Sequence, residues 1–506
     1  MKQTERNLPI KLYSAAQIKE LERIAIDERG ISAYELMSRA GQAVYEHLLK
    51  HCAKVETIKA RTIAVFCGSG NNAGDGFIVA RLALLAGFKV DVICIADPLI
   101  LKGAALQAYQ TYLNAKGTIS LFEENQPICA DVIVDAMLGT GLLRVVTGRY
   151  AKAIEVINNT VAYKIAIDIP TGLHADTGNV LSCAVKVDCT VTFIGLKQGL
   201  FTGFSADYCG EIAYSSLAVP DDIFDQVTAT IIRVIQKPLP KRERTSHKGS
   251  YGHVLIVGGD IGYSGAARLA GEASARVGAG LVSLATRQAH AGYINLTRPE
   301  LMCHGFDMSE KLAPEQDSTE QLRILLDKAN VIVVGPGLGQ SEWAKKLFDA
   351  VLSTQKPLVI DADGLNLLAQ FPKVNANWIL TPHPGEAARL LKSTTHGIQS
   401  DRFAAVRAIQ CQYGGIVVLK GAGTLIASEV NIAVSTTGNP GMASGGMGDV
   451  LSGVIAGLLA QGFPMEEAAQ QGVYLHGLAA DLAVAEAGER GLLAGDLFHY
   501  LRRLVN

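Results

Sequence analysis

Several hallmarks of other protein classes are missing from this 506-residue chain. Its nine cysteines contain no Cys-x-x-Cys pair and are odd in number, which argues against a disulfide framework or a zinc site and favours a reducing cytosol. No uninterrupted run of about 18 apolar residues occurs, so we expect no membrane span. Residues 1–30 carry charges throughout and lack the apolar core of a signal peptide. We therefore expect a cytoplasmic protein.

An excess of charge of either sign is also missing. The formal net charge is −2, which gives no reason to expect a nucleic acid or an anionic membrane as a partner. An anionic ligand would then need local positive charge or free backbone N–H groups. Hydrophobic residues make up 49% of the chain and charged residues 19%, a balance that supports large buried cores and argues against disorder.

The chain is too long for one ordinary domain of roughly 100 to 200 residues. Apolar runs alternate with helical patterns, which predicts α/β domains with parallel sheets and crossover helices. Residues 14–30 are predicted to begin with an amphipathic helix capped by Ser14. The strand-like runs are TIAVFCG from residue 62, KVDVICIA from 89, DVIVDAMLG from 131, YKIAIDIP from 163, CTVTFIG from 189, HVLIVGG from 253, LVSLAT from 281, NVIVVGPG from 330, PLVIDADG from 357, NWILTPHPGE from 377 and GIVVLKGAGT from 415.

The stretch QKPLPKRERTSHKGSYG, residues 236–252, interrupts this alternation. Its two prolines and its cluster of basic residues are typical of a linker, although a long surface loop could have the same composition. We therefore predict one domain in residues 1–236 and another in residues 237–506. In both halves, nearly every predicted strand ends in glycine, proline or an acid. Because ligands bind outside the carboxyl ends of parallel strands, both halves are expected to carry a site there.

The first half has a glycine- and asparagine-rich loop, CGSGNNAGDG from residue 67, between a predicted strand and a predicted helix. Ala73 stands where the dinucleotide fingerprint needs its third glycine, so the loop does not match that fingerprint. Its backbone N–H groups, with Asn71, Asn72 and Asp75, could hold phosphate and ribose groups. A turn without a ligand would use the same residue types.

Two further acids of the first half end predicted strands. Asp135 closes the run DVIVD, and Asp168 closes the run YKIAID just before Thr171. Buried carboxylates are costly unless they are solvated, paired or bound to a cation. Asn72, Asp135 and Thr171 offer oxygen ligands, which suit a hard cation, and Asp168 could act as a base. The alternative is that both acids simply form turns.

The second half contains the sequence SGGMGDVLSGVIAG from residue 444, a glycine-rich loop at the start of a helical pattern. Backbone N–H groups at a helix N-terminus form an anion site, because they are unpaired and the helix dipole is positive there. Asp449 could then take a proton from a hydroxyl group as it attacks a phosphoryl group. The alternative is that Asp449 is an ordinary helix cap.

Two other loops of the second half are candidates. KGAGT, residues 420–424, follows a strand, so Lys420 could face nucleotide phosphates or could be a solvated turn lysine. TPHPGE, residues 381–386, holds His383 between two prolines, although a single histidine is more often structural than functional. GPGLG, residues 335–339, would let a ligand approach the backbone closely.

Taken together, these motifs resemble a known family. HKGSYGHVLIVGG, GPGLG, DADGLNLL, TPHPGEAARLL, LKGAGT and GNPGMASGGMGDVLSG resemble the ADP- or ATP-dependent NAD(P)H-hydrate dehydratases of the ribokinase-like superfamily. CGSGNNAGDG, VDAMLGTGL and AIDIPTGLHADTG resemble the NAD(P)H-hydrate epimerases. Both halves in this order are similar to the bifunctional NAD(P)H-hydrate repair enzymes of bacteria. The resemblance implies two three-layer α/β/α domains, an N-terminal Rossmann-like domain and a C-terminal ribokinase-like domain.

For the second half the resemblance implies ADP-dependent dehydration of the S form of NADH-hydrate or NADPH-hydrate, with magnesium and with Asp449 as catalytic base. Met447 stands where a threonine is commoner in the superfamily, which leaves the backbone donors unaffected. The implied substrate-binding residues are Ala266, Gly337, His383 and Asp449. The implied nucleotide-binding residues are Lys420, Gly421, Ala422, Gly423, Thr424, Gly445, Gly446, Met447 and Gly448.

For the first half the resemblance implies epimerisation of the R and S hydrates, with Asp168 as the catalytic residue. It also implies a potassium ion held by Asn72, Asp135 and Thr171. The oxygen ligands alone would not distinguish potassium from magnesium. The implied substrate-binding residues are Asn71, Asn72, Ala73, Gly74, Asp75, Gly139, Thr140, Gly141, Leu142, Leu143, Arg144, Val145 and Asp168.

Two other interpretations stay open at this point. A ribokinase-like kinase for a small molecule such as a vitamin precursor would share the glycine loop and its acid, and would yield a stable phosphorylated product. The first half could also be a non-catalytic binding module. We expect a homo-oligomer, with a tetramer as the working guess, and the sequence does not distinguish NADH-hydrate from NADPH-hydrate preference.

Overall fold

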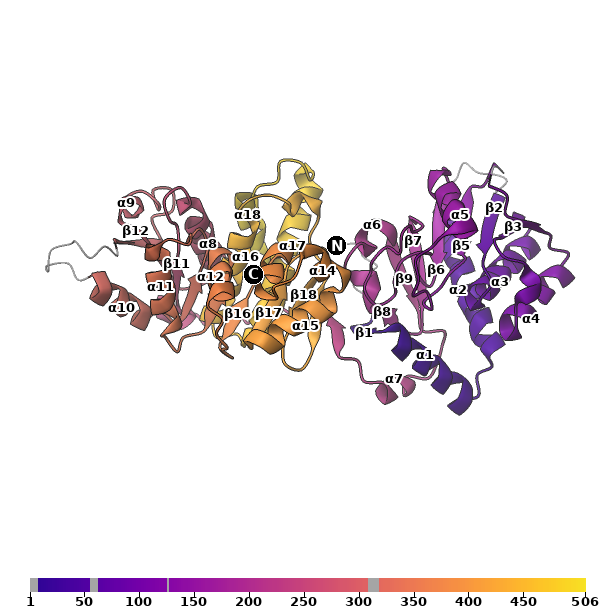
Figure 1. The fold of residues 1–506 in the computed structure, drawn as a ribbon, viewed down its shortest axis with the longest axis horizontal. Helices are drawn as coiled ribbons and strands as arrows, with labels where there is room; N and C mark the ends of the chain where they lie inside the picture. The colour runs from indigo at the N-terminus through magenta and orange to yellow at the C-terminus, as the bar shows by residue number, and fades with distance from the viewer. Residues whose placement is uncertain (1–7, 55–61, 125–126, 308–317) are drawn as a thin grey trace. The chain divides into compact units, whose positions relative to one another are not determined.

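All eleven apolar runs predicted as strands form strands in a computed structural model, which describes residues 8–54, 62–124, 127–307 and 318–506. The chain folds into two compact units, divided between Ile231 and Ile232. The two units are described separately below, and Figure 1 shows their elements. No helix within the described residues is long and apolar enough to cross a bilayer. All nine cysteines are free.

The first unit is built on a parallel sheet with strand order β4-β3-β2-β5-β6-β7-β9. A separate parallel pair joins β1 to β8. The strands are β1 (Lys11–Tyr13), β2 (Thr62–Cys67), β3 (Lys89–Cys94), β4 (Ile119–Leu121), β5 (Val132–Ala136), β6 (Tyr163–Ile167), β7 (Cys189–Phe193), β8 (Leu196–Lys197) and β9 (Glu211–Ser215), and β10 (Ile231–Arg233) follows at the unit boundary.

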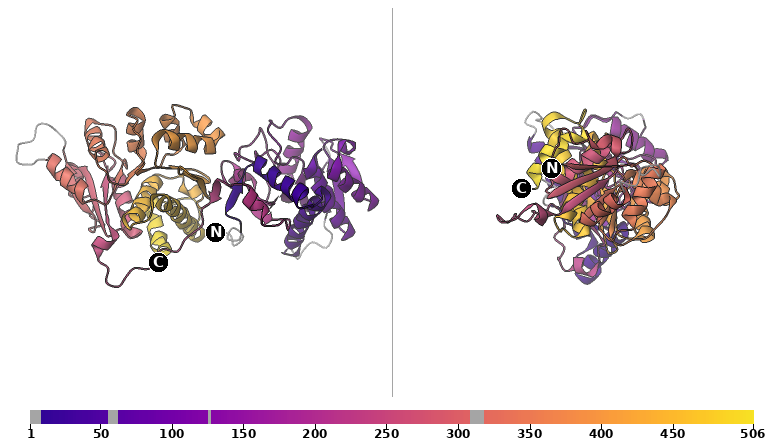
Figure 2. Two further views of the ribbon diagram at one scale, coloured as in Figure 1. Left: turned by 90° about the horizontal axis from the view of Figure 1, so that it is seen from below. Right: turned by 90° about the vertical axis from the view of Figure 1, so that its left-hand side faces the viewer.

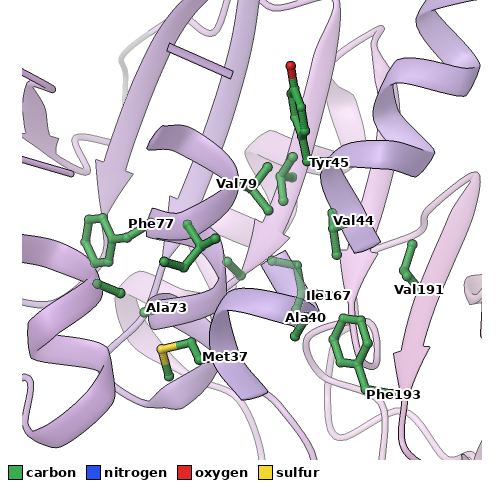
Figure 3. Packing of buried hydrophobic residues seen from close by; sticks show 14 of the residues in the cluster. Met37, Ala40, Val44, Tyr45, Ala73, Phe77, Val79, Ile167, Val191 and Phe193 are labelled. Carbon is green, nitrogen blue, oxygen red and sulfur yellow. The ribbon is translucent and has the colours of Figure 1, made fainter. Parts of the chain in front are cut away.

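Helices cover both faces of this sheet, which makes three layers (Figure 1). The helices are α1 (Ala15–Arg23), α2 (Ala33–Lys54), α3 (Asn71–Leu85), α4 (Gly103–Asn114), α5 (Gly148–Asn159), α6 (Ser205–Tyr208) and α7 (Ile223–Gln226). Apolar side chains of α2, α3 and α4 share one core with one face of the sheet, while α5 packs on the other face. Figure 3 shows Phe77 and Val79 of α3 beside Met37 of α2 and Ile167 of β6 in the first of these cores.

The predicted N-terminal helix is confirmed. The Ser14 hydroxyl accepts a hydrogen bond from the Gln17 backbone N–H at 3.2 Å, and the Gln17 side-chain oxygen accepts one from the Ser14 backbone N–H at 2.8 Å. This reciprocal capping satisfies two backbone donors that the helix cannot pair internally. After α1 the chain widens into a π-helical turn, Ile24–Glu28.

The second unit has a longer sheet, with order β13-β12-β11-β14-β15-β16-β17-β18-β19. The pairings are parallel as far as β17 and antiparallel for β18 and β19. These strands are β11 (His253–Val257), β12 (Leu281–Arg287), β13 (Met302–Phe306), β14 (Val331–Val334), β15 (Leu358–Ile360), β16 (Trp378–Leu380), β17 (Ile416–Leu419), β18 (Thr424–Ala427) and β19 (Ile432–Ser435).

The helices of the second unit form two layers, and Figure 2 shows the orange helices and the yellow helices on opposite sides of the sheet. Helices α8, α16, α17 and α18 bury their apolar residues against one face. The helices of the unit are α8 (Ser264–Arg276), α9 (Gln288–Ala291), α10 (Ser318–Lys328), α11 (Glu342–Leu352), α12 (Ala362–Gln370), α13 (Pro384–Leu390), α14 (Thr395–Ser400), α15 (Arg402–Tyr413), α16 (Met447–Ala460), α17 (Met465–Ala487) and α18 (Leu497–Leu504).

The stretch 236–252, predicted as a linker, lies against the second unit. The Arg242 guanidinium stacks 3.7 Å from the centre of the Tyr251 ring and donates to the Gln461 side chain at 3.1 Å. The Lys237 backbone N–H donates to the Gln471 side chain at 3.0 Å. The segment is therefore held by side chains of the folded unit rather than left as a free tether.

The backbones of helices α8 and α16 come into contact where the helices cross, because α16 has glycine at the crossing. A Cβ atom placed on Gly453 would lie 2.1 Å from the Ala270 carbonyl oxygen, and one on Gly457 would lie 2.8 Å from the Ser274 carbonyl oxygen. The Ser274 hydroxyl donates to the Gly453 carbonyl across the same crossing at 2.8 Å. This close approach fixes the position of α16, which carries Asp449 in its first turn.

We expect Gly453→Ala to lower the free energy of unfolding of the second unit by about 2–4 kcal/mol, because a backbone atom cannot move aside as a flexible side chain can. Helix propensity alone would predict the opposite sign, a gain of about 1 kcal/mol. Gly292→Ala is the matched control, since open space surrounds Gly292, and it should stay within about 0.5 kcal/mol of the wild type. Denaturant unfolding of both variants measures this, and equal stability would show that the crossing tolerates a methyl group.

Candidate functional site

A cavity of about 1230 Å³ opens at the carboxyl ends of the strands of the first unit. Loops after β2, β5 and β6 supply much of its wall. The predicted site residues in that wall are Asn71, Asn72, Asp75, Gly139, Thr140, Gly141, Leu142, Leu143, Arg144, Val145 and Asp168. Ala73 and Gly74, predicted with them, do not line it, because both are buried and face other helices. A Cβ atom on Gly74 would lie 2.5 Å from the Met37 sulfur.

Of the three predicted cation ligands, Asp135 and Thr171 are hydrogen-bonded to each other, and Asn72 lies in the cavity wall. The Thr171 hydroxyl donates to Asp135 Oδ1 at 2.7 Å, and the Thr171 backbone N–H donates to Asp135 Oδ2 at 2.7 Å. The Leu138 N–H donates to the Thr171 hydroxyl at 2.9 Å. The next residue, Gly139, lies against Asn72, since a Cβ atom placed on it would be 3.7 Å from Asn72 Oδ1.

Asp135 is a buried carboxylate without a basic partner. Only 1% of its surface is exposed, and no Lys, Arg or His side chain of the described residues forms a salt bridge with it. Burial raises the pKa of Asp135 to about 6, although hydrogen bonds from Thr171 and Met137 counteract the rise. The Asn72 amide nitrogen is also buried, and no group in the described ranges pairs with it. Buried oxygen donors without a counter-charge fit a hard cation.

Asp168 follows β6 in a left-handed conformation, with φ of 67°, which non-glycine residues seldom adopt. Its Oδ1 atom accepts hydrogen bonds from the Thr192 hydroxyl at 3.2 Å and from the Phe193 N–H at 3.3 Å, and also pairs with the Lys197 ammonium. Its side chain is 16% exposed, within the cavity wall. The strained backbone and three donors together fix where this carboxylate points.

Asp75 faces the same cavity from α3. Burial raises its pKa well above the usual range, and the charges of Asp168 and Glu22 add to the rise. Asp75 is therefore protonated under conditions in which an ordinary aspartate is ionised. Neutral Asp75 can donate a hydrogen bond, and Asp168, which pairs with the Lys197 ammonium, can accept one, so the cavity offers both a donor and an acceptor.

In the second unit, Asp449 lies in the first turn of α16, as the sequence predicts. Gly446 is the N-cap, with φ of 90°, and a Cβ atom on it would lie 2.6 Å from Leu269. Only glycine fits this position without strain. The loop therefore brings backbone N–H groups to the N-terminus of a 14-residue helix, where the helix dipole favours negative charge.

Lys420 lies directly beneath this loop. Its ammonium pairs with Asp361 at 2.8 Å and with Glu386 at 3.8 Å. A Cβ atom on Gly448 would lie 3.2 Å from the Lys420 ammonium. Burial lowers the pKa of Lys420, but the charges of Asp361 and Glu386 outweigh this and raise it, so the ammonium stays charged. The lysine predicted to face nucleotide phosphates is thus tied to a buried carboxylate beside the anion loop.

Asp361 joins Lys420 to α16. Its second oxygen accepts from the Ser452 hydroxyl at 2.6 Å, and Ser452 lies one turn after Gly448 in α16. Burial, followed by the charge of Asp361, raises the pKa of Asp449 to about 7, while Lys420 counteracts the rise. A carboxyl group that titrates near neutral pH can accept a proton and release it again.

The remaining predicted residues of the second unit lie at neighbouring strand ends. A Cβ atom on Gly337 would be 3.1 Å from the Ala266 side chain, so these two residues are in contact. His383 caps α13, and its ring accepts from the Gly385 N–H at 2.9 Å while half of its surface stays exposed. The Lys420 N–H donates to the Pro382 carbonyl at 2.9 Å, which joins the loop of His383 to that of Lys420.

The loop from Gly421 to Thr424 rests on a buried arginine that the sequence did not indicate. Arg402 is 2% exposed, and its guanidinium donates to the carbonyls of Leu419 and Gly423, both at 3.3 Å. Burial lowers the pKa of Arg402 to about 10, so it remains charged at neutral pH. Gly421 and Ala422 themselves are exposed.

Comparison with known proteins places these two sites in a known family. Residues 254–503 match a family model described as NAD(P)H-hydrate dehydratase, and residues 33–199 match one described as YjeF-related protein N-terminus. The bifunctional NAD(P)H-hydrate repair enzyme Nnr of Coxiella burnetii is 49% identical over 501 residues, which cover 98% of this chain and 99% of that protein. Its namesake in Escherichia coli is 42% identical over 510 residues, which cover 100% and 96%.

A crystal structure of the ADP/ATP-dependent NAD(P)H-hydrate dehydratase from Bacillus subtilis is 33% identical, with a TM-score of 0.46. It covers 53% of this chain and 93% of the crystallised chain. The two bifunctional relatives match this chain almost from end to end, through both units and in the same order. This chain belongs to the family of bifunctional NAD(P)H-hydrate repair enzymes.

Proposed function

We propose that this protein repairs hydrated nicotinamide cofactors in two steps, one in each unit. Residues 1–236 interconvert the R and S forms of NADH-hydrate or NADPH-hydrate. Residues 237–506 dehydrate the S form with ADP and release AMP and phosphate. The observation that supports this best is Asp449, a carboxyl group with a pKa of about 7 at a glycine-rich helix N-terminus. The similarity to bifunctional repair enzymes over nearly the whole chain also supports it.

In the second unit, Asp449 takes the proton of the ring hydroxyl as that oxygen attacks the terminal phosphoryl group of ADP. A new P–O bond forms on the ring oxygen, and the bond between the two phosphoryl groups of ADP breaks to leave AMP. The backbone N–H groups of Gly445, Gly446, Met447 and Gly448 stabilise the charge on the moving phosphoryl group. Loss of phosphate and of a ring proton then restores the dihydronicotinamide.

The substrate and the nucleotide are held by residues around this centre. Ala266, Gly337 and His383 contact the hydrate, and the loop formed by Lys420, Gly421, Ala422, Gly423 and Thr424 contacts ADP. Magnesium would neutralise charge on the nucleotide phosphates. Within the described residues no group of three His, Cys, Asp or Glu side chains forms a metal site, so we propose that magnesium arrives with the nucleotide.

In the first unit, Asp168 exchanges a proton with the hydrate, which lies in the cavity against Asn71, Asn72, Asp75 and the loop from Gly139 to Val145. Ala73 and Gly74, buried in the first turn of α3, belong to the same proposed substrate-binding stretch. Asn72, Asp135 and Thr171 would hold a potassium ion, which supplies a fixed positive charge beneath the bound substrate. We also propose a cytoplasmic homo-oligomer, with a tetramer as the first state to test.

The central test is the return of NADH absorbance when the purified protein meets a mixture of R and S hydrates, magnesium and either ADP or ATP. Full conversion, faster than the hydrates epimerise unaided, is the expected result. The better nucleotide identifies the donor, and repeating the assay with NADPH-hydrate gives the substrate preference. A stable phosphorylated product without NADH would instead indicate a kinase, and conversion of the S fraction alone would leave the first unit without its activity.

The dehydratase rate should depend on the ionised form of Asp449. Because its pKa is about 7, the rate should be level above pH 8 and fall about tenfold per unit below pH 6. Asp449→Asn should lower kcat by about 10²- to 10⁴-fold, the usual worth of a general base. Epimerisation by the same variant is the control and should be unchanged. A dehydratase rate that is flat from pH 5 to pH 8 would exclude Asp449 as the base.

Asp449→Asn should also stabilise the second unit at alkaline pH. The folded-state pKa of about 7 exceeds the ordinary aspartate value of 3.8, so the folded carboxyl holds its proton while the unfolded one loses it as the pH rises from about 4 to 7. This difference lowers wild-type stability above pH 7, and we expect the variant to gain about 1–3 kcal/mol at pH 8. Denaturant unfolding at pH 4 is the control, where the two proteins should be equal.

Replacement of potassium by tetramethylammonium should slow epimerisation about tenfold or more, the cost of about 1.4 kcal/mol of lost stabilisation. The dehydratase should keep its rate with ADP and magnesium, because none of the proposed potassium ligands belongs to the second unit. Chromatographic separation of R and S hydrates without nucleotide measures the first step alone. Equal epimerisation in both salts would remove the cation from the proposed site.

A further inference from the structure

We propose that Lys197 is a positioning residue for epimerisation, which fixes Asp168 so that one carboxylate oxygen is presented to the hydrate. The inference rests on the proposed function of the first unit, in which Asp168 exchanges the proton. Lys197 lies at the end of β8, outside every motif identified in the sequence. The argument depends on where its ammonium group lies and on what is left for Asp168 to do.

The ammonium of Lys197 is buried and fully engaged. Only 1% of the residue is exposed. The ammonium donates to the Phe193 carbonyl at 3.0 Å and to the Thr192 hydroxyl at 3.1 Å, and it pairs with Asp168 Oδ1. These three acceptors match the three N–H donors of an ammonium group. Lys197 itself does not line the cavity, whereas its ion-pair partner Asp168 does.

The two oxygens of Asp168 have different surroundings. Oδ1 receives all three donors, from Thr192, Phe193 and Lys197. No donor of the described residues reaches Oδ2, although Asp168 is part of the cavity wall. One oxygen therefore anchors the side chain, and the other is left to face a bound molecule. Such an arrangement holds a reacting group in place before the substrate arrives.

Lys197 also balances the charge of this corner of the cavity. Asp75 and Glu22 lie close enough to Asp168 for its charge to raise the pKa of each, in addition to the larger effect of burial. The Lys197 charge counteracts the rise at both positions. Without Lys197, the three neighbouring carboxyl groups of Glu22, Asp75 and Asp168 would lack their buried cation. Because an unpaired buried charge is costly, Asp168 would then rotate toward solvent.

The backbone of Lys197 is anchored by the N-terminal strand. β8 pairs in parallel with β1, and Tyr13 is the partner of Lys197. The tight turn between β7 and β8 brings Lys197 back to Thr192 and Phe193, whose side-chain and backbone oxygens it contacts. Ile194 makes this turn at φ of 62°, a second left-handed residue beside that of Asp168. The pairing of β8 with β1 and the turn after β7 therefore set the position of the Lys197 ammonium.

The experiment uses the full chain and follows epimerisation without nucleotide. Lys197→Ala should lower kcat about 10²-fold, the usual cost of a reacting group displaced by about 1 Å, with little change in KM because substrate contacts remain. Methylammonium, which can occupy the space left by the side chain, should restore part of the rate. A merely structural lysine would not give this split between kcat and KM, nor rescue by a small amine.

Two further variants keep the test decisive. Lys186→Ala is the matched control, because Lys186 is exposed and lies 5.8 Å from the centre of the Tyr208 ring, and it should keep the wild-type kcat and show no response to methylammonium. Thr192→Val removes one donor from Asp168 Oδ1 and should lower kcat even if Lys197→Ala folds poorly. An unchanged kcat in both Lys197→Ala and Thr192→Val would overturn the proposal. A wild type that does not speed epimerisation would instead overturn the proposed function of the unit.

Discussion

The ion pair between Lys420 and Asp361 determines the arrangement of the second site. Asp361 follows β15, Lys420 follows β17, and the Ser452 hydroxyl of α16 donates a hydrogen bond to the Asp361 carboxylate. One buried acid thus joins the ends of two strands to the helix whose N-terminus forms the anion loop. Burying a charge is costly unless it is paired, so these groups are held together in one arrangement. Burial, followed by the charge of Asp361, raises the pKa of the nearby Asp449 to about 7.

The first unit reaches a similar result with different parts. Its proposed reacting carboxylate, Asp168, is itself the anion of the buried pair, with Lys197 as the cation. In the second unit the paired acid, Asp361, is separate from the proposed reacting acid, Asp449. Asp168 is therefore anchored through one oxygen. Asp449 is half-buried, and burial together with the charge of Asp361 raises its pKa. Each unit therefore controls one carboxyl group by placing a lysine beside the end of a sheet.

Sequence reasoning identified the parts of the fold that have a local signal. Nearly all of the eleven predicted strands are apolar runs that stop at glycine, proline or an acid. The strands that it missed lack this signal: β4 has three residues at a sheet edge, and every residue of β9 is only partly buried. The antiparallel pair β18 and β19 was also missed, because two four-residue runs resemble loop segments when their pairing is unknown.

The site was predictable to a similar extent. Asp135 and Thr171 were placed together because strand ends meet at one edge of a parallel sheet, and the structure joins them by two hydrogen bonds. Lys197 and Arg402 were not predicted. Lys197 meets Asp168 from 29 positions away, and Arg402 meets the carbonyls of a loop 17 to 21 positions away. No spacing rule connects such residues, since tertiary packing alone brings them together.

The pairing of β1 with β8 has a consequence for the order in which the protein is made. Tyr13 is synthesised early, but its partner Lys197 follows 184 positions later (197 minus 13). At a synthesis rate of about 5–20 residues per second, β1 waits about 10–40 seconds for the strand that completes it. During that time the edge of β1 has no partner from β8, and the carboxylate of Asp168 has no lysine. The buried pair of Asp168 and Lys197 therefore forms only after residue 197 has left the ribosome.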